Sequence, residues 1–158
     1  MQQEKRKMQL TQKEVELLKD LSTQEKLCVD KYTRHAECAK DVQLKNLFTE
    51  IAKIESHHLA MITDMQNGTV PPQGNGGGQY KPTFKPTYTT AETPEKQNDC
   101  YLCTDVLTAE KHASHLYDTC VFEFTDENAR TTLNSIQSQE QNHGKLIYDY
   151  MKANSMQA

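Results

Sequence analysis

The hydrophobic and polar positions of the chain follow a helical period in four separate segments. Apolar residues recur in them at spacings of three and four, as on the buried face of an amphipathic helix. The segments cover approximately residues 13–40, 41–66, 99–124 and 127–152. Strand-like alternation of apolar and polar residues does not occur in any of them. The pattern therefore predicts an all-α protein with four helices.

The connections between the segments predict how the helices are arranged. The links near Asp41 and Asp126 are very short, and short links place consecutive helices side by side and antiparallel. We therefore expect a single domain, residues 1–158, built as a four-helix bundle. Its parts are hairpin one (13–66) and hairpin two (99–152), joined by one long crossover.

The crossover, residues 67–98, differs in composition from the helical segments. It is rich in proline, glycine and threonine, and Pro82, Pro86 and Pro94 forbid a helix there. Its KPTFKPTYTT stretch (81–90), together with Tyr80 before it, carries interleaved aromatic side chains that we expect to pack on the bundle or on a partner subunit. These aromatic residues are Tyr80, Phe84 and Tyr88.

The two hairpins are copies of each other. Adding 85 to a residue number in hairpin one gives the related residue of hairpin two without any gap. The related pairs include Glu25 with Glu110, Tyr32 with Tyr117, Asp41 with Asp126, Ile51 with Ile136, Glu55 with Glu140 and His58 with His143. The duplication has kept polar residues inside an apolar stripe while neighbouring positions changed, which indicates that these polar residues have a role.

Six of the repeated polar residues predict one site. Each hairpin has a lone glutamate in its first helix and an E-x-x-H in its second, all in the middle third of an apolar stripe. Residues three apart on a helix share a face, so the glutamate and histidine of one E-x-x-H can bind one ion together. The six residues are Glu25, Glu55, His58, Glu110, Glu140 and His143.

Four buried carboxylates favour a metal site over an empty core. Each ionised carboxylate would lose several kcal/mol in desolvation and would repel the others. Two divalent cations balance four carboxylates and leave both histidines neutral as donors, and the same ligand set occurs in di-iron and di-manganese bundles. We expect Glu55 and Glu140 to bridge the ions and Glu25 and Glu110 to be terminal ligands. Carboxylate and imidazole suit both iron and manganese, so the sequence does not choose between them.

Simpler interpretations exist for each part of this pattern. A single E-x-x-H arises often by chance, and one buried histidine is usually a hydrogen-bonded core residue. Tyr32 and Tyr117, seven residues after the lone glutamates, are most simply core aromatics, although they are placed to donate hydrogen bonds to ligands or to carry electrons. The lone C-x-x-C of Cys100 and Cys103 has no second pair, so we expect free thiols or a local disulfide there.

Composition excludes some classes of function. The net charge of −4, with acidic and basic residues mixed along the chain, does not provide the basic surface that nucleic-acid binding needs. No apolar run reaches the roughly 18 residues of a membrane span. The first ten residues lack the hydrophobic region of a signal peptide. We therefore expect a soluble intracellular protein.

With these residues in view, the chain resembles the coat F family of bacterial spore coat proteins, a branch of the ferritin-like superfamily. The resemblance covers about residues 10–152 and rests on four segments. These are LLKDLSTQEKLCVDKY, LKNLFTEIAKIESHHL, YLCTDVLTAEKHASHLYDTCVFEF and SIQSQEQNHGKLIYDYM. It implies a ferritin-like four-helix bundle in or around the coat of a spore-forming bacterium, with a homo-oligomer (a dimer) or other spore coat proteins as partners. The hairpins are also similar to rubrerythrin, but the paired C-x-x-C tail of that family is missing.

The sequence fits two functions. One is a structural coat protein with a metal-stabilised core, and the other is a di-iron or di-manganese oxidase, peroxidase or catalase that removes peroxide. Access separates them, because catalysis needs an open coordination position while a structural site is closed. Iron storage is a third possibility, but no feature of the sequence specifies a hollow cage.

Overall fold

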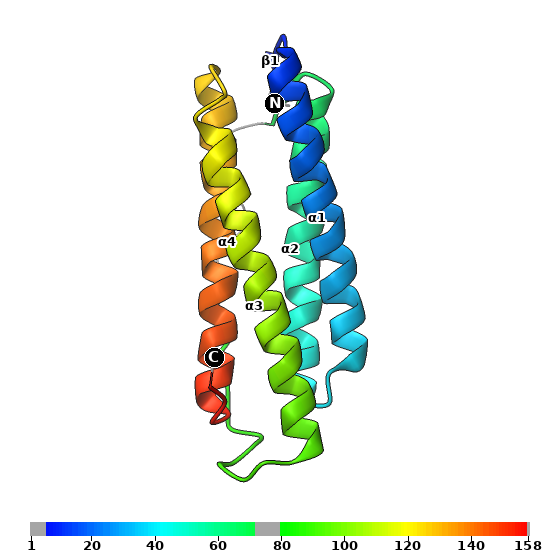
Figure 1. The fold of residues 1–158 in the computed structure, drawn as a ribbon, viewed down its shortest axis with the longest axis vertical. Coiled ribbons are helices and arrows are strands. Elements are labelled where there is room, and N and C mark those ends of the chain that lie inside the picture. Colours follow the sequence, from blue (N-terminus) through cyan, green and yellow to red (C-terminus); the bar gives the residue numbers. More distant parts are fainter. Residues whose placement is uncertain (1–5, 72–79, 158) are drawn as a thin grey trace, which may run out of the picture.

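Four long helices packed side by side make up most of the computed structural model, which describes residues 6–71 and 80–157. They are α1 (Gln12–Cys38), α2 (Val42–Gln66), α3 (Pro94–Val121) and α4 (Glu127–Ala153). The helices α1 and α2 form one antiparallel pair and α3 and α4 the other (Figure 1). Across the pairs, α1 packs on α3 and α2 packs on α4. The prediction of an all-α bundle of two hairpins is confirmed.

The repeat-related residues Asp41 and Asp126 begin the second helix of each hairpin. The Asp41 carboxylate accepts a hydrogen bond from the backbone N–H of Gln43 at 3.1 Å, and Asp126 accepts from Asn128 and Ala129 at 2.9 and 3.0 Å. A side-chain acceptor at this position satisfies N–H groups that have no partner inside the helix. Each hairpin can therefore turn within a few residues.

The prediction was wrong about where the third helix begins. We expected it near Asp99, after the last proline, but α3 begins at Pro94. The Thr93 hydroxyl accepts from the backbone N–H of Lys96 at 3.1 Å and caps the helix. Proline suits the first helical position because the N–H that it lacks would have no helical partner there. Pro94 therefore starts a helix, so that hairpin two is longer than expected and the crossover is shorter.

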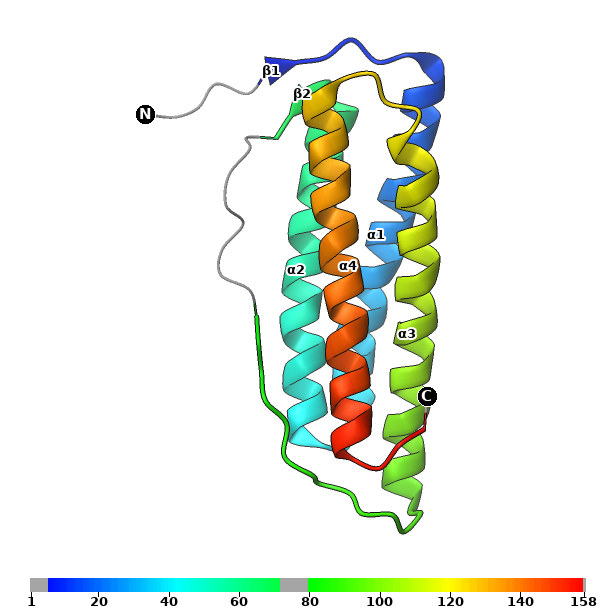
Figure 2. The same ribbon diagram turned by 90° about the vertical axis from the view of Figure 1, so that its left-hand side faces the viewer.

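The described part of the crossover lies on the outside of the bundle. From Tyr80 onward it runs past the end of α2 and α4 to reach α3 (Figure 2). Its aromatic side chains are partly buried against the core, and the Phe84 ring packs edge-on against Tyr150 with centroids 5.5 Å apart. The expected packing of this stretch on the bundle is confirmed. Residues 72–79 lie outside the described part of the chain.

Asp99 joins three parts of the chain at this end of the bundle. Its buried carboxylate accepts hydrogen bonds from the backbone N–H groups of Lys40 and Asp41 at 2.8 and 2.9 Å. It also accepts from the Tyr88 hydroxyl at 2.6 Å. The turn of the first hairpin, the crossover and the start of α3 are thus held together by one side chain.

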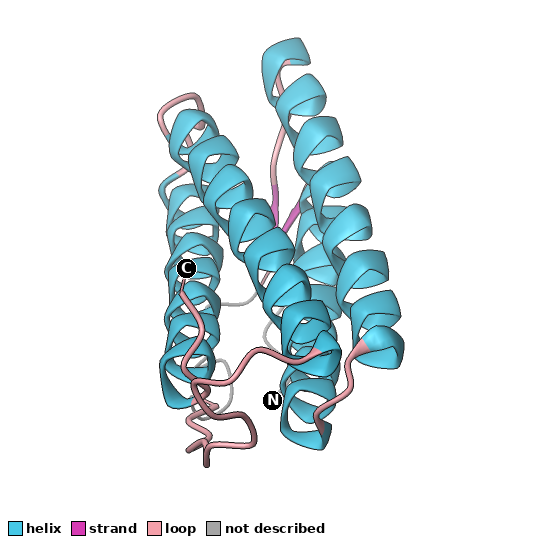
Figure 3. Cartoon of the chain, turned by 60° about the horizontal axis from the view of Figure 1, so that its bottom comes forward, coloured by secondary structure: helices cyan, strands magenta, loops and turns pink. Residues whose placement is uncertain are grey.

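The opposite end carries a small two-stranded ribbon. The strand β1 (Arg6–Lys7) pairs antiparallel with β2 (Thr69–Val70), and Figure 3 shows how short both are beside the helices. The helix α2 ends at Gln66, and Gly68 beyond it has a φ of +76°. Among the helices of the described residues, none is long and apolar enough to cross a membrane.

Substitution by alanine should have opposite effects on stability at the two glycines that the structure describes. At Gly68 an added Cβ would lie 2.9 Å from the Met8 carbonyl oxygen, and the positive φ disfavours any L side chain. We expect Gly68→Ala to lower the free energy of unfolding by about 1–3 kcal/mol. At Gly144, inside α4, an added Cβ would meet Leu107 Cδ1 at 3.7 Å, an ordinary contact. Gly144→Ala should therefore raise it by up to about 1 kcal/mol. Urea unfolding of both variants measures this, and equal effects would contradict it.

Candidate metal centre

The structure brings all six repeated polar residues into one layer of the bundle, which we call the glutamate–histidine layer. The side chains are at most 3% exposed. One apolar cluster, which includes Phe48 and Ile147, lies on one side of the layer, and a second, which includes Leu18 and Leu133, lies on the other. The members of the layer are Glu25, Glu55, His58, Glu110, Glu140 and His143.

The layer contains two overlapping groups of potential ligands. In each group, one oxygen or nitrogen atom from every residue lies within 4.8 Å of the others. Glu55 and Glu140 occur in both groups, as bridging carboxylates would. The first group is Glu25, Glu55, His58 and Glu140, and the second is Glu55, Glu110, Glu140 and His143.

The histidines connect the two hairpins through their Nδ1 atoms. Nδ1 of His58 lies 2.9 Å from Oε1 of Glu140 and 3.2 Å from Oε2 of Glu55. Nδ1 of His143 lies 3.0 Å from Oε1 of Glu55 and 3.2 Å from Oε1 of Glu110. Each histidine therefore meets a glutamate of the other hairpin, and Nδ1 is the atom placed to bind a metal.

Three carboxylate oxygens in the layer have no hydrogen-bond partner among the described residues. They are Oε2 of Glu25, Oε2 of Glu110 and Oε2 of Glu140, all fully buried. Buried polar atoms almost always have partners, because an unpaired one costs free energy on folding. Divalent cations prefer carboxylate oxygen and imidazole nitrogen and would satisfy these atoms. The residues present therefore fit two metal ions, and their binding stays a prediction.

Without metal, the layer retains protons. Burial, aided by the neighbouring charge of Glu55, raises the pKa of Glu25 from 4.5 to about 10, and burial raises the pKa of Glu140 well above its usual value. Burial also acts to raise the pKa of Glu55, but hydrogen bonds from His143 and His58 outweigh it and hold that pKa well below 4.5. Burial disfavours a charged His143, yet hydrogen bonds to Glu110 and Glu55 raise its pKa to about 9.

Tyr32 and Tyr117 have a more specific role than core packing. The Tyr32 hydroxyl donates to Oε1 of Glu110 at 2.6 Å, and the Tyr117 hydroxyl donates to Oε1 of Glu25 at 2.6 Å. Each tyrosine thus orients the lone glutamate of the other hairpin. Burial and the neighbouring glutamates raise the pKa of both hydroxyls well above 10, so both remain donors. Both tyrosines are also fully buried members of the core clusters, so the expectations of core aromatics and of hydrogen-bond donors to the site residues are both confirmed.

Gln139 is a site residue that the sequence did not reveal. Its Oε1 contacts Nε2 of His58. An amide oxygen there keeps a proton on Nε2 and leaves Nδ1 turned toward the carboxylates, which is how ligand histidines are usually held. The related residue in the first hairpin is Ile54, so the repeat did not point to Gln139.

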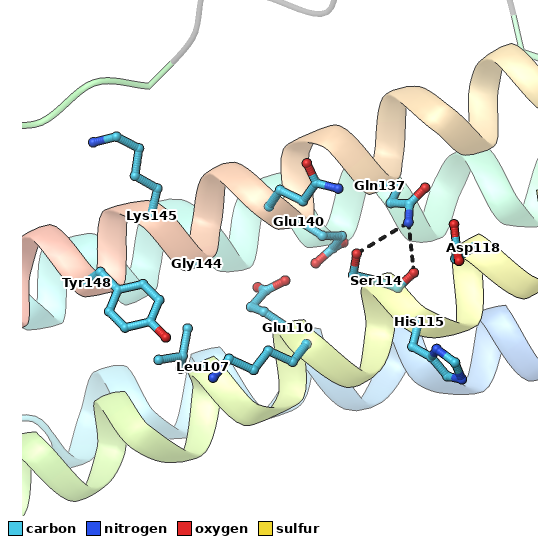
Figure 4. Close-up of a pocket in the computed structure, with 12 residues that line it drawn as sticks. Leu107, Glu110, Ser114, His115, Asp118, Gln137, Glu140, Gly144, Lys145 and Tyr148 are labelled. Carbon is cyan, nitrogen blue, oxygen red and sulfur yellow. Dashed lines mark hydrogen bonds between the residues drawn. The ribbon is translucent and has the colours of Figure 1, made fainter. Parts of the chain in front are cut away.

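A cavity of about 670 Å³ between α3 and α4 reaches the glutamate–histidine layer (Figure 4). Glu110 and Glu140 line its inner side, and Gly144 lies between them and the surface residue Tyr148. The Gln137 amide crosses from α4 to donate to the Ser114 carbonyl oxygen at 3.0 Å. We call this space the α3–α4 cavity. It ends at the layer, where Glu110 and Glu140 are 3% and 1% exposed.

A four-helix bundle of two antiparallel hairpins with glutamates and E-x-x-H pairs facing its core has the architecture of the ferritin-like proteins. Part of the chain also matches a known family. Residues 98–157 match the family model of the Coat F domain. The resemblance to the coat F family is thereby confirmed, over the second hairpin.

Solved structures support the same fold. One is a dodecameric thioferritin, a bacterioferritin-related protein from Bacteroides fragilis, with a TM-score of 0.65 and 18% identity over 92% of this chain and 88% of that one. Another is a protein from Anabaena variabilis with DJ-1/ThiJ/PfpI-like and ferritin-like domains. It has a TM-score of 0.62 and 14% identity over 85% of this chain, which spans only 34% of that protein. No curated protein matches the sequence.

The protons held by the metal-free layer predict how its stability depends on pH. Folding raises the pKa of Glu25 from 4.5 to about 10 and that of His143 from 6.5 to about 9, so between pH 6.5 and 9 the folded chain binds more protons than the unfolded one. Stability must then fall as pH rises through this range. Glu55 acts in the opposite direction, but only below pH 4.5.

In EDTA, we expect the thermal midpoint to be several degrees lower at pH 9 than at pH 6.5. A divalent ion replaces these protons, so added Mn²⁺ should recover the midpoint at pH 9. Glu25→Gln, which carries no titrating carboxyl, is the matched control and should show a weaker dependence. A midpoint that rises with pH in the metal-free protein would contradict this account of the layer.

Proposed function

We propose that this chain is a ferritin-like protein of the spore coat type that binds two divalent ions, iron or manganese, and that this centre removes peroxide. One observation carries the proposal. Four glutamates and the Nδ1 atoms of two histidines meet in a buried layer in which three carboxylate oxygens lack partners.

Charge and geometry favour two ions over one. Four carboxylates balance two divalent cations when both histidines are neutral, and the two overlapping ligand groups provide a place for each ion. In this proposal Glu55 and Glu140, which occur in both groups, would be shared by the two ions. Glu25 with His58 and Glu110 with His143 complete the two ends. Tyr32 and Tyr117 hold the terminal glutamates in place through their hydrogen bonds.

Redox chemistry is supported by access to the layer. Six protein residues leave several coordination positions vacant on two ions, and the α3–α4 cavity reaches Glu110 and Glu140 from the surface. Iron or manganese held by these residues would supply two-electron redox chemistry, in which one peroxide is reduced to water and a second is oxidised to O₂. Two H₂O₂ thus give two H₂O and one O₂, and no other reductant is needed. The chain itself contributes a dry, oriented set of carboxylates and a route for a small substrate.

A structural role in the spore coat is the second candidate. The Coat F match supports a place in or around the coat of a spore-forming bacterium. Each ligand group contains residues from both hairpins, so bound ions would tie the hairpins together. Self-association, as a dimer or a larger assembly, fits both candidates and is supported by the dodecameric state named for the Bacteroides fragilis protein.

The first test is metal content. Protein purified without chelators should carry about two transition-metal ions per chain by elemental analysis. Replacing both bridging candidates, Glu55→Ala with Glu140→Ala, should remove nearly all of this metal because both ligand groups lose shared members. Glu16→Ala, at an exposed position of α1, is the control and should retain it. Reproducible absence of metal from the unaltered chain would end the proposal.

The second test is turnover. Metal-loaded protein should disproportionate H₂O₂ and release O₂, measured with an oxygen electrode. Turnover should be lost in the Glu55→Ala, Glu140→Ala variant, with Glu16→Ala again as the control. If the loaded protein is more heat-stable than the metal-free protein but inert toward peroxide, the structural role is the correct one. Normal turnover in the metal-free double variant would rule out catalysis by this centre.

A further inference from the structure

The two hairpins repeat the same six polar residues but not the same neighbours. Beside the layer, α3 and α4 carry Ser114, Gln137 and Gly144. At the related positions of the first hairpin, each small or polar residue of the second hairpin is replaced by a larger or more apolar one. These related residues are Val29, Ala52 and Leu59. The two hairpins therefore agree at the six potential ligands and differ at residues that lie between these ligands and the surface.

Gly144 is the sharpest of these differences. It follows His143 directly and lines the α3–α4 cavity together with Glu110 and Glu140. An added Cβ there would meet only Leu107 Cδ1, at 3.7 Å, so a larger side chain would project into open space. The related Leu59 follows His58 on α2 and is half-buried, while Glu25 and Glu55 are 0% exposed.

We propose that the α3–α4 cavity is the functional entrance to the centre, and that small anions enter it to bind the ion held by Glu110 and His143. This inference rests on the proposed two-metal function and specifies its open half. In the first hairpin Leu59 takes the place of Gly144, and Glu25 and His58 are 0% and 1% exposed.

On the side of Tyr148 the charged residues that line the cavity are lysines, while the carboxylates that line it are Glu110 and Glu140 at the layer and Asp118 at the other end. Lys111 lines the cavity and has no carboxylate partner among the described residues; its ammonium lies 5.9 Å from the centre of the Tyr148 ring. Lys145 lines it as well, although it is paired with Asp149 at 2.6 Å. In Figure 4 the hydrogen bonds between Gln137 and Ser114 separate the two glutamates from Asp118, whereas the side of Lys145 and Tyr148 is not crossed by such a bridge.

Azide binding to Co²⁺-loaded protein tests this inference without any catalysis. Azide is a small anion, and its binding changes the visible absorption of Co²⁺. Gly144→Leu copies the first hairpin and should weaken azide binding by about tenfold or more at unchanged cobalt content, because a closed site excludes external ligands. Leu59→Ala is the matched control in α2 and should bind azide like the unaltered chain.

Gly144→Met, which places a more flexible side chain at the same position, is the second blocking variant and decides the question if circular dichroism shows that Gly144→Leu does not fold. Lys111→Glu should weaken azide binding most at low salt. Azide binding that persists in the folded blocking variants, or that changes only in Leu59→Ala, would overturn the entrance. Unchanged binding in Lys111→Glu would overturn the preference for anions.

The outcomes also separate this inference from the proposal on which it depends. If the unaltered chain takes up no Co²⁺, the two-metal function fails. If it takes up Co²⁺ and azide leaves the spectrum unchanged, the metal site stands and the entrance is refuted.

Discussion

The burial of four carboxylates in one apolar layer is the constraint on which the rest of the structure depends. In a bundle of this size, each buried charge is tolerated only with a partner of opposite charge or a proton. The metal-free layer uses protons on Glu25, Glu140 and His143 and hydrogen bonds from two tyrosines. These contacts orient the side chains, so that the same groups that stabilise the empty layer also prepare it for cations.

The internal repeat accounts for the two matching sets of potential ligands, and the differences between its two copies underlie the proposed entrance. The repeat supplies two equivalent sets of donors, and the structure crosses them so that each histidine meets a glutamate of the other hairpin. The residues beside this symmetric centre differ between the hairpins, since Gly144 of hairpin two corresponds to Leu59 of hairpin one in the repeat. A duplicated fold can thus keep the same polar residues in both halves while the side chains beside them change in one half.

The sequence predicted the helices, the hairpin pairing and the convergence of the six polar residues, because each follows from spacing along one helix or from the repeat. It misplaced the start of α3, since Pro94 reads as a helix breaker until Thr93 is seen to cap it. It did not identify Gln139 as a partner of His58, nor decide which glutamate each tyrosine contacts. Those contacts lie between helices, and periodicity carries no information on how two helices are set against each other.

The crossed tyrosines have a consequence for the origin of the fold. The Tyr32 hydroxyl donates to Glu110 and the Tyr117 hydroxyl donates to Glu25. In each of these hydrogen bonds the donor lies in one hairpin and the acceptor in the other. A lone ancestral hairpin could have formed this arrangement only by pairing with a second copy of itself. The tyrosine–glutamate contacts therefore require two hairpins side by side, whether these belong to one chain or to two.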